Sequence, residues 1–450
     1  MPSELQVPAG WETSTIEELM LDGAVTYGVV QPGPAVESGT PMLRVNNFRG
    51  YGLDTSDVMR IAPDVEAKYT RTRIRADDVL ITVVGSVGQV AVVPKELAGW
   101  NVARAVALLR PRERQFARWI ASCLRAPTTQ HALGMAANTT VQTTINLKDL
   151  RKLELPIPPA AERQAIQGVL SALDDRIDLL RQTNATLESI AQALFKSWFI
   201  DFDPVRAKAE GREPEGMDAA TAALFPAEFE ASIPAGWQMG TLETLCAQGG
   251  GLIQTGPFGS QLHASDYEAQ GIPVVMPQDL DGRRISTDRV ARVSVAHVER
   301  LARHKLLPGD IVFSRRGDVG QHAAVTEVEA GWLCGTGCLL VRPGPRWPSP
   351  AYVSQALATP EATDWVKRHA VGATMPNLNT GILGALPMLL PSNAVLAAFE
   401  SVCGALEARI TKNRAQALAL SELLDTLLPR LISGKLRLPE ARSHIEEVMA

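Results

Sequence analysis

The chain has 450 residues, of which 46% are hydrophobic and 21% are charged, a composition that is typical of globular proteins and excludes a disordered or fibrous chain. Its length corresponds to about three domains. The 44 Lys and Arg residues against 49 Asp and Glu residues give a net charge of −5, which excludes a uniformly basic nucleic-acid-binding protein, so any DNA-binding surface has to consist of local basic patches.

The cysteines and the distribution of apolar residues predict a soluble, cytoplasmic protein. Five cysteines are too few, and odd in number, for a disulfide framework. Cys334 and Cys338 form a close pair without a histidine at zinc-ligand spacing, so buried free thiols are favoured over a zinc site. The first residues lack the basic start and apolar run of a secretion signal, and no apolar stretch approaches the 18 residues of a membrane span.

The sequence contains two similar copies of one pattern of short strings. Residues 7–11 read VPAGW and residues 233–237 read IPAGW, and DDVLITVVGSVGQ at 77–89 matches GDIVFSRRGDVGQ at 309–321. ALDDRI at 172–177 likewise matches ALEARI at 405–410. Because the separation of matching strings stays near about 230 residues along the whole chain, the pattern indicates a tandem duplication.

Each copy begins with a mixed domain, at residues 1–156 and 233–391. Short β-branched runs such as 79–84 and 311–313 are typical of strands between Gly and Pro turns, and a helix is expected around 114–124. The predicted fold class is therefore α+β, with two mixed α/β domains in tandem.

Each copy continues with a long helix, at residues 157–200 and 392–436. Apolar or small residues recur at alternating spacings of four and three, which is a 3.5-residue period. These positions are Ile166, Leu170, Leu173, Ile177, Leu180, Asn184, Leu187, Ala191, Leu194 and Trp198 in the first helix, and Phe399, Cys403, Leu406, Ile410, Asn413, Ala417, Leu420, Leu424, Leu427 and Leu431 in the second. The period predicts a coiled coil, whereas the alternative, an amphipathic helix on a globular core, has a wider apolar face.

The ends of the helices carry the expected signals. Pro158 and Pro159 precede the first helix, Ser392 can cap the second, and Gly434 follows it, while Pro429 is expected to kink or end the second helix early. Residues 201–232, which include Pro204 after the first helix, predict an extended connector anchored by Phe202, Phe225 and Phe229, and residues 437–450 form a tail.

Each helix carries one asparagine in its apolar seam. If the helices pair antiparallel, with Ile166 beside Leu431 and Trp198 beside Phe399, then Asn184 and Asn413 fall in one layer. A buried polar layer costs stability but fixes the register, because a slipped pairing leaves an amide without a partner. We expect Asn184 and Asn413 to lock an antiparallel coiled coil.

The sequence offers no recognisable catalytic machinery. We find no GxxxxGK[ST] phosphate loop, no HExxH zinc motif, no Gly-rich dinucleotide loop and no GxSxG nucleophile elbow. His297 and His304 lie in a basic segment and are expected to be solvated. No catalytic, cofactor-binding or metal-binding residue is predicted.

Positive charge is concentrated at matching places in the two copies. Residues 68–75 read KYTRTRIR, and residues 283–316 hold nine Arg and Lys residues against three acidic residues. The candidate DNA-binding residues of these patches are Lys68, Tyr69, Arg71 and Arg73 in the first copy and Arg283, Arg284, Arg303, Arg315 and Arg316 in the second. Solvated surface is the alternative interpretation, but equivalent patches in duplicated domains suit one duplex that passes both.

Side chains that can read base edges also recur on expected loops. Arg donates to guanine, Asn and Gln pair with adenine, and Ser or Thr bonds either. The candidates are Arg44, Asn46, Asn47, Asn138, Thr139, Thr140 and Gln142 in the first copy, and Phe258, Ser260, Gln261, Gln278, Asn377 and Asn379 in the second. Turn formation explains any one of these residues equally well, and their recurrence in both copies favours DNA binding.

On these strings the chain resembles the DNA-specificity (S) subunits of type I restriction–modification systems. The most specific strings are ALFKSWFIDFDPVRAKAEGREP at 193–214, LLPRLISGKL at 427–436, GPFGSQL at 256–262, and the paired starts at VPAGW and IPAGW. The resemblance extends over essentially the whole chain. The first copy departs from the second in its recognition loops, with VQTTIN at 141–146 in place of MPNLN and no equivalent of GPFGSQL.

The resemblance implies a non-catalytic specificity subunit with two target-recognition domains. Each domain would read one half of a bipartite site in double-stranded DNA, and the coiled coil would set the spacer. About 33 residues of helix span roughly 50 Å, against about 34–36 Å for one DNA turn. The implied partners are two adenine-methyltransferase subunits and, in a restricting complex, two translocase–nuclease subunits. S-adenosylmethionine, ATP and magnesium would belong to those partners.

Two other functions remain open from the sequence. A self-contained methyltransferase or nuclease would need a cofactor loop or a metal site, and we recognise neither. A coiled-coil scaffold that binds only protein would make the basic patches incidental, which a DNA-binding assay distinguishes.

Overall fold

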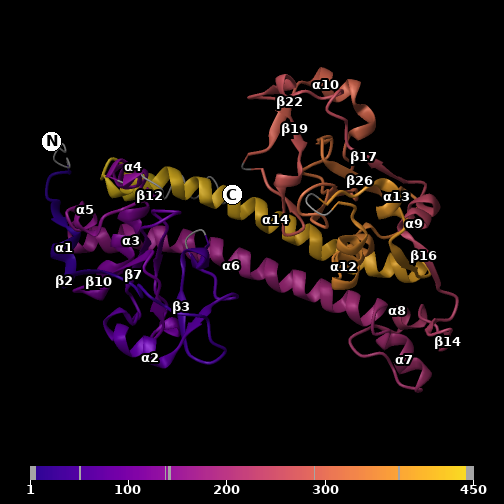
Figure 1. Ribbon diagram of the computed structural model, residues 1–450, viewed down its shortest axis with the longest axis horizontal. Helices are drawn as coiled ribbons and strands as arrows, with labels where there is room; N and C mark the ends of the chain where they lie inside the picture. The colour runs from indigo at the N-terminus through magenta and orange to yellow at the C-terminus, as the bar shows by residue number, and fades with distance from the viewer. Residues whose placement is uncertain are drawn as a thin grey trace. The chain divides into compact units, whose positions relative to one another are not determined.

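The chain divides into two compact units. The structure is a computed structural model that describes residues 7–49, 52–136, 138–139, 143–287, 289–372 and 376–441 (Figure 1). Unit 1 comprises the described residues up to Arg181 and from Ala415 onwards, and unit 2 comprises Gln182–Arg414. Each unit therefore contains one globular domain together with a part of each long helix.

The core of unit 1 is an antiparallel sheet buried on both faces. Its strand order is β2 (Met20–Tyr27), β10 (Val106–Pro111), β7 (Val79–Thr82) and β8 (Val90–Val92). Alternate residues of β7 face opposite layers, so that Val79 and Ile81 pack with helix α3 (Ala117–Arg125) and Leu80 packs into a second cluster. Burial of both faces explains why this strand is apolar at successive positions.

The remaining elements of unit 1 surround this sheet. A second sheet has the order β6 (Met59–Ile61), β3 (Thr40–Leu43) and β9 (Asn101–Val102), and β1 (Glu12–Thr15) pairs with β13 (Glu154–Ile157). The short elements are α1 (Ile16–Leu19), η1 (Val45–Asn47), β4 (Phe48–Arg49), β5 (Gly52–Leu53), α2 (Pro63–Glu66), η2 (Ala67–Thr72), η3 (Lys95–Leu97), η4 (Arg114–Phe116), α4 (Pro127–Ala136), β11 (Asn138–Thr139), β12 (Thr143–Thr144) and α5 (Leu147–Arg151).

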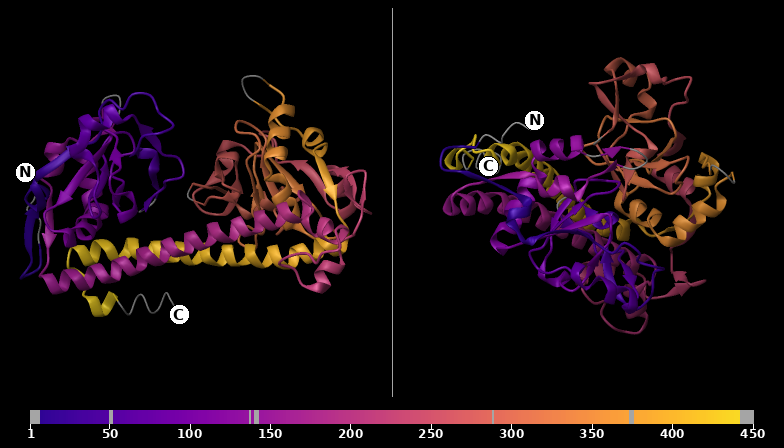
Figure 2. Two further views of the ribbon diagram at one scale, coloured as in Figure 1. Left: turned by 90° about the horizontal axis from the view of Figure 1, so that it is seen from below. Right: turned by 60° about the vertical axis from the view of Figure 1, so that its left-hand side comes forward.

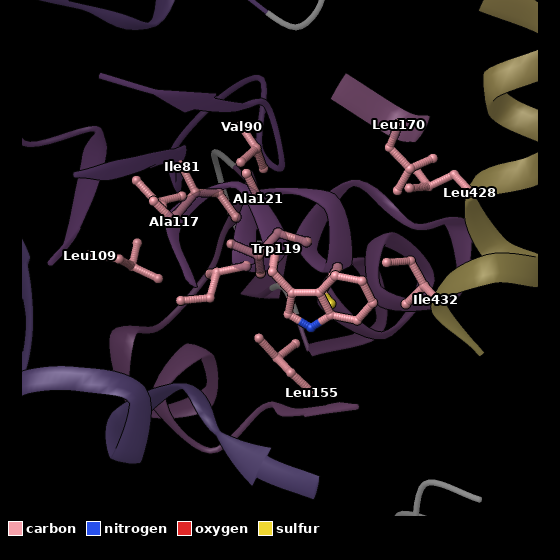
Figure 3. Packing of buried hydrophobic residues seen from close by; sticks show 14 of the residues in the cluster. Ile81, Val90, Leu109, Ala117, Trp119, Ala121, Leu155, Leu170, Leu428 and Ile432 are labelled. Atoms are coloured by element: carbon pink, nitrogen blue, oxygen red, sulfur yellow. The ribbon is translucent and has the colours of Figure 1, made fainter. Parts of the chain in front are cut away.

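Trp119 of α3 joins the sheet to the long helices in unit 1. Its side chain is fully buried, and its indole Nε1 donates a hydrogen bond to the carbonyl oxygen of Pro156 at 2.9 Å. Figure 3 shows the indole beside Leu155, with Leu170 of the first long helix near Leu428 of the second. The globular domain and the helix pair thus share one hydrophobic core within this unit.

Unit 2 repeats the topology of unit 1. Its main sheet has the order β17 (Leu252–Thr255), β26 (Cys338–Arg342), β23 (Ile311–Ser314) and β24 (His322–Ala324), which matches β2, β10, β7 and β8. The second sheet has the order β18 (Tyr267–Glu268), β22 (Ala291–Val293), β19 (Ile272–Val275) and β25 (Leu333–Cys334), and β16 (Gln238–Thr241) pairs with β27 (Pro387–Leu390) (Figure 1). The predicted α+β fold and its duplication are confirmed.

The other elements of unit 2 are short. They are α7 (Asp203–Ala209), α8 (Ala219–Ala223), β14 (Phe229–Glu230), β15 (Ile233–Pro234), α9 (Leu242–Gly249), η5 (Ala264–Asp266), η6 (Pro277–Asp279), β20 (Leu280–Asp281), β21 (Arg284–Ile285), α10 (Val295–Arg300), η7 (Ala302–His304), α11 (Pro350–Leu357), α12 (Pro360–His369) and α13 (Thr380–Gly384). Across both units, none of the described helices is long and apolar enough to cross a membrane.

The long helices α6 (Ala160–Phe199) and α14 (Asn393–Ile432) run antiparallel inside each unit (Figure 2). In unit 1, Glu162 near the start of α6 pairs with Arg437 just beyond the end of α14, at 3.3 Å. In unit 2, Trp198 near the end of α6 contacts Phe399 near the start of α14, with ring centroids 5.7 Å apart. The seam residues of both helices are mostly buried, which confirms the predicted antiparallel coiled coil.

One expectation about the helix ends needs correction, and another is confirmed. Helix α14 continues through Pro429 to Ile432. The proline removes one N–H donor from the helix, and the burial of its neighbours Leu428 and Leu431 offsets that loss. Gly434 follows at φ +68°, a conformation that favours glycine, and a Cβ there would lie 2.3 Å from Cγ of Pro8.

The connector is also more structured than expected. Helices α7 and α8 form within residues 201–232, which we expected to be extended, and Pro204 stands in the first turn of α7. The predicted anchor Phe225 is buried against Trp198, with ring centroids 5.0 Å apart. The aromatic anchors therefore fold this segment onto the end of α6 within unit 2.

The five cysteines are buried free thiols, as the sequence predicts. Burial raises the pKa of Cys334 to about 12, so the thiol is held in its neutral form. Its neighbour Cys338 donates a weak hydrogen bond to the carbonyl oxygen of Val275 at 3.5 Å. Both thiols belong to the core beneath the two sheets of unit 2.

Candidate nucleic-acid interface

A polar cleft in unit 2 brings together two of the predicted DNA-reading residues. The cleft has a volume of about 410 Å³ and lies between the η6–β20–β21 segment and the loop that joins β23 to β24. Gln278 contributes from the first wall and Arg316 from the second. The other polar side chains that line it are Asp281, Ser314, Asp318 and Gln321.

A buried carboxylate shapes the first wall. Asp279 is 2% exposed, and its Oδ2 accepts a hydrogen bond from the backbone N–H of Met276 at 2.8 Å. This bond closes the η6 turn and leaves the preceding residue, Gln278, exposed. Burial raises the pKa of Asp279, and the Met276 N–H acts in the opposite direction.

The equivalent turn in unit 1 contains two of the predicted site residues, Asn46 and Asn47. Asn47 occupies the place of Asp279, is 2% exposed, and accepts from the backbone N–H of Arg44 at 2.8 Å. Its Nδ2 donates to the carbonyl oxygens of Asp54 and Asp57 at 2.9 and 2.8 Å. Asn47 is therefore a buried turn residue with its amide satisfied, and Asn46 is the exposed side chain equivalent to Gln278.

The donors and acceptors of the cleft suit base edges better than phosphates. Arg316 can donate to guanine, and the amides of Gln278 and Gln321 can both donate and accept, as adenine requires. The carboxylates of Asp281 and Asp318 can accept from the amino group of cytosine, whereas they would repel a phosphate. Oδ2 of Asp318 already accepts from Nε2 of Gln321 at 3.1 Å, which orients both side chains.

Arg283 and Arg284, two of the predicted DNA-binding residues, form hydrogen bonds within unit 2. Nη2 of Arg283 donates to Oγ of Ser354 on α11 at 2.8 Å, and burial lowers the pKa of its guanidinium. Nη2 of Arg284 donates to Oε1 of Glu188 on α6 at 2.6 Å. The sequence could not distinguish these two from surface arginines because their partners are distant along the chain.

The basic segment of unit 1 presents two free cations. Lys68 and Arg71 are exposed and form no hydrogen bond or ion pair with the described residues. Arg73, by contrast, forms a two-pronged ion pair with Glu66, and its guanidinium lowers the pKa of that carboxyl. The hydroxyl of Tyr69 accepts a hydrogen bond from the backbone N–H of Gln31 at 3.3 Å.

The basic segment of unit 2 differs in one respect from the expectation. Arg303, which aligns with Arg71, is exposed, and its Nε donates to Nε2 of His304 at 3.0 Å. His304 is 1% exposed rather than solvated, and burial together with Arg303 lowers its pKa to about 4. The imidazole of His304 is therefore neutral and can accept the hydrogen bond from Arg303.

A duplicated ion pair fixes the backbone of both basic segments. Asp78 in unit 1 and Asp310 in unit 2 are each 2% exposed and bind Arg110 and Arg342 at 2.8 and 2.6 Å. Nη2 of each arginine also donates to a carbonyl oxygen of the basic segment at 2.8 Å, that of Arg73 or of Lys305. In each unit, this buried ion pair therefore holds the backbone that carries the cations of the basic segment.

The polar segment before β27 contains two predicted DNA-binding residues, Asn377 and Asn379. Asn379 caps helix α13, since its Oδ1 accepts from the backbone N–H of Ile382 at 2.8 Å. Asn377 forms a backbone bridge with Arg316 of the cleft. Its Oδ1 and Nε of Arg315 are buried without a hydrogen-bond partner among the described residues.

Three further groups of predicted DNA-binding residues differ in exposure and in bonding. On the GPFGSQL loop, Phe258 is 52% exposed and Ser260 is also exposed, while Oε1 of Gln261 accepts from the backbone N–H of Phe258 at 3.1 Å. Arg44 in unit 1 forms an ion pair with Asp57 at 3.4 Å. The backbones of Asn138 and Thr139 form β11, but their side chains, and all of Thr140 and Gln142, lie outside the described residues.

Sequence reasoning missed four polar lining residues of the cleft: Asp281, Ser314, Asp318 and Gln321. A signal for Gln321 was present, because GSVGQ and GDVGQ recur in the two copies and end in Gln89 and Gln321.

Comparisons with known proteins agree on one family. Residues 8–189 match the family model for the type I restriction modification DNA specificity domain. The type I restriction enzyme HindI specificity subunit of Haemophilus influenzae is 28% identical over 335 residues, covering 65% of this chain and 71% of that protein. The EcoBI specificity subunit of Escherichia coli is 25% identical over 228 residues, covering 49% of this chain and 48% of that protein.

A solved structure shows the same fold over nearly the whole chain. The type I restriction–modification S subunit from M. genitalium has a TM-score of 0.54 and 16% identity, covering 96% of this chain and 97% of that chain. At this identity the likeness concerns the fold.

Proposed function

We propose that this chain is a type I restriction–modification DNA specificity subunit and that it selects the sequence on which a multisubunit DNA methyltransferase and endonuclease acts. Members of this family supply sequence recognition and leave catalysis to other subunits. Each globular domain of this chain reads one half of a bipartite target in double-stranded DNA.

The observation that carries this proposal is that the two domains share one fold but have different side chains at equivalent positions of the cleft. Arg316 and Asp318 line the cleft of unit 2, and the duplicated string places Val84 and Ser86 at the same positions in unit 1. An arginine suits guanine, whereas an apolar side chain suits the methyl group of thymine. Two such domains read different half-sites, so the target is asymmetric.

The antiparallel helices set the unread spacer between the half-sites. Each helix has 40 residues and therefore a length of about 60 Å, which exceeds the 34–36 Å of one DNA turn. A coiled coil with a polar layer keeps one register, and this supports a single preferred spacer.

The catalytic partners are two adenine-methyltransferase subunits and, in a restricting complex, two translocase–nuclease subunits. S-adenosylmethionine, ATP and magnesium bind to those subunits. The assembly works in the cytoplasm, where the chromosome is methylated. The strings at 193–214 and 427–436, which follow the two long helices, are the segments by which the chain resembles the family most.

Mapping of methylated adenines in the host genome tests the proposal. We expect a bipartite methylated motif that disappears when the gene is deleted and returns on complementation. Replacing residues 1–156 with those of a related subunit is expected to change the first half-site and leave the second. Methylation that persists after deletion, or methylation of DNA by the purified chain alone, would contradict the proposal.

A further inference from the structure

One carboxylate of the coiled coil holds two arginines in unit 2. Oε1 of Glu188 on α6 accepts from Nη2 of Arg284 at 2.6 Å and from Nη2 of Arg414 on α14 at 2.8 Å. Glu188 lies one helical turn after Asn184, and Arg414 directly follows Asn413. The contact therefore joins both long helices and the globular domain next to the polar layer of the seam.

The arginine that reaches the coil stands at the end of a tight hairpin. Asp281 pairs with Arg284 across a two-residue turn made by Gly282 and Arg283, with φ of +52° and +68°. Positive φ at both central residues is the type I′ turn, and it is unfavourable for a side chain as large as arginine. The bonds from Arg283 to Ser354 and Gln355 on α11, at 2.8 and 3.4 Å, hold that residue in place.

The same hairpin is a wall of the polar cleft. Asp281 and Gly282 line the cleft directly, and Gln278 lies just before the hairpin. Arg316 and Gln321 face them from the other wall. A displacement of Arg284 would be transmitted to Asp281 through one rung of a two-stranded ladder, because these two residues are direct partners.

We propose that Glu188 is a positioning residue for DNA reading by the second domain. Its bond to Arg284 fixes the position of the β20–β21 hairpin, which forms one wall of the cleft. Its bond to Arg414 fixes that position relative to helix α14 and therefore relative to the register of the coiled coil. This inference rests on the proposed function, because it assumes that the cleft reads bases. Glu188 acts through the hairpin and is not itself a DNA contact.

Among the described residues, the first domain does not place the same pair of side chains at the equivalent positions. In its hairpin, Gly52 pairs with Arg49 as Arg284 pairs with Asp281, so the arginine is replaced by a residue without a side chain. The duplicated helix has Ser421 where α6 has Glu188. The positioning contact therefore acts on the second half-site alone, which makes the first half-site an internal control.

The test uses the complex assembled from the full chain and its methyltransferase subunits. Four forms are compared: wild type, Glu188→Gln, Arg284→Gln and the double variant. Asp178→Asn is the matched control, because it removes the same charge from the same helix at a residue that pairs with Arg181 one turn away. Competition binding measures the preference for the target over duplexes with one mismatch in either half-site.

We expect Glu188→Gln to reduce discrimination at the second half-site by roughly three- to tenfold and to leave the first half-site unchanged. Arg284→Gln should have the same effect, the double variant should be no worse than either single variant, and Glu188→Asp should restore part of the preference. Arg284 is 43% exposed, so its replacement is compatible with folding and keeps the test valid if Glu188→Gln fails to assemble.

Equal losses at both half-sites, no loss, or additive effects of the two substitutions would overturn the inference. A wild-type complex without a bipartite preference would instead contradict the proposed function. The two failures are distinguishable, because the first requires a wild-type complex that discriminates normally.

Discussion

Asn413 donates through Nδ2 to Oδ1 of Asn184 at 2.9 Å across the seam of the coiled coil. Asn184 in turn reaches the carbonyl oxygen of Ile410 with its own Nδ2 at 3.4 Å. The two side chains are 1% and 5% exposed. Asn184 lies two heptads before Trp198, and Asn413 lies two heptads after Phe399, so both contacts belong to one register.

Replacing one asparagine is expected to destabilise the coil. Asn413→Leu leaves the buried amide of Asn184 without its partner, at a cost of about 1–3 kcal/mol in the free energy of unfolding. The double variant Asn184→Leu/Asn413→Leu should recover this loss, because no amide is then left unpaired. Urea unfolding of the full chain measures both, and a double variant weaker than the single one would refute the pairing argument.

Lengthening the rod is expected to lengthen the spacer. Seven residues inserted between 181 and 182, with seven more between 415 and 416, add one facing heptad and about 10 Å, which corresponds to about three base pairs. A heptad nearly preserves the phase of the helix, so both half-sites should persist. Genomic methylation mapping reads the spacer. Four-residue insertions serve as the control, since they rotate the seam and should abolish methylation.

The exposed cations of the basic segments are expected to contact phosphates. Arg71→Ala or Arg303→Ala should weaken binding to all sequences alike and reduce the slope of log affinity against log salt by about one. Lys95→Ala in the first domain is the control, because that exposed lysine lies outside the basic segments. A change in base preference without a change in the salt slope would assign these arginines to base reading instead.

The adjacent residues Asn46 and Asn47 should behave oppositely. Asn46 is exposed at the place equivalent to Gln278, so Asn46→Ala should relax one position of the first half-site by about 1–3 kcal/mol of discrimination. Asn47→Ala removes three hydrogen bonds of a buried turn and should lower the melting temperature. Binding to mismatched duplexes and thermal unfolding separate the two effects.

The second domain is expected to lose stability in mild acid. Burial lowers the pKa of His304 and of His322 to about 4, so between pH 6.5 and 4 the unfolded chain binds more protons than the folded one. The stabilisation is complete above pH 6.5 and falls with pH, by about 2 kcal/mol per histidine at pH 5.

Hydrogen exchange of peptides around β23 and β24 measures this loss. Val90 and Thr72 stand at the equivalent positions of the first domain, which should therefore be less sensitive to pH. His322→Val copies the first domain and should reduce the pH dependence of the second. An unchanged dependence would show that His322 is already protonated in the folded protein or contributes nothing.

The coiled coil was predictable because its information is local. A helix has a fixed period, so the alternation of four and three residues specifies which side chains share the seam. The repeat in the chain then predicted the second helix. The single asparagine in each seam predicted which positions of the two helices face each other. Ile166 through Trp198 could be assigned before any contact was known.

The roles of individual polar side chains depended on tertiary structure. Asn46 and Asn47 are identical neighbours in the sequence, yet one is exposed and the other is buried by bonds to Asp54 and Asp57. Arg284 and Arg316 carry the same charge, yet one binds Glu188 across 96 positions and the other lines the cleft. Periodicity encodes which face of a helix is apolar, but a polar group takes its role from partners that only folding brings within hydrogen-bond distance.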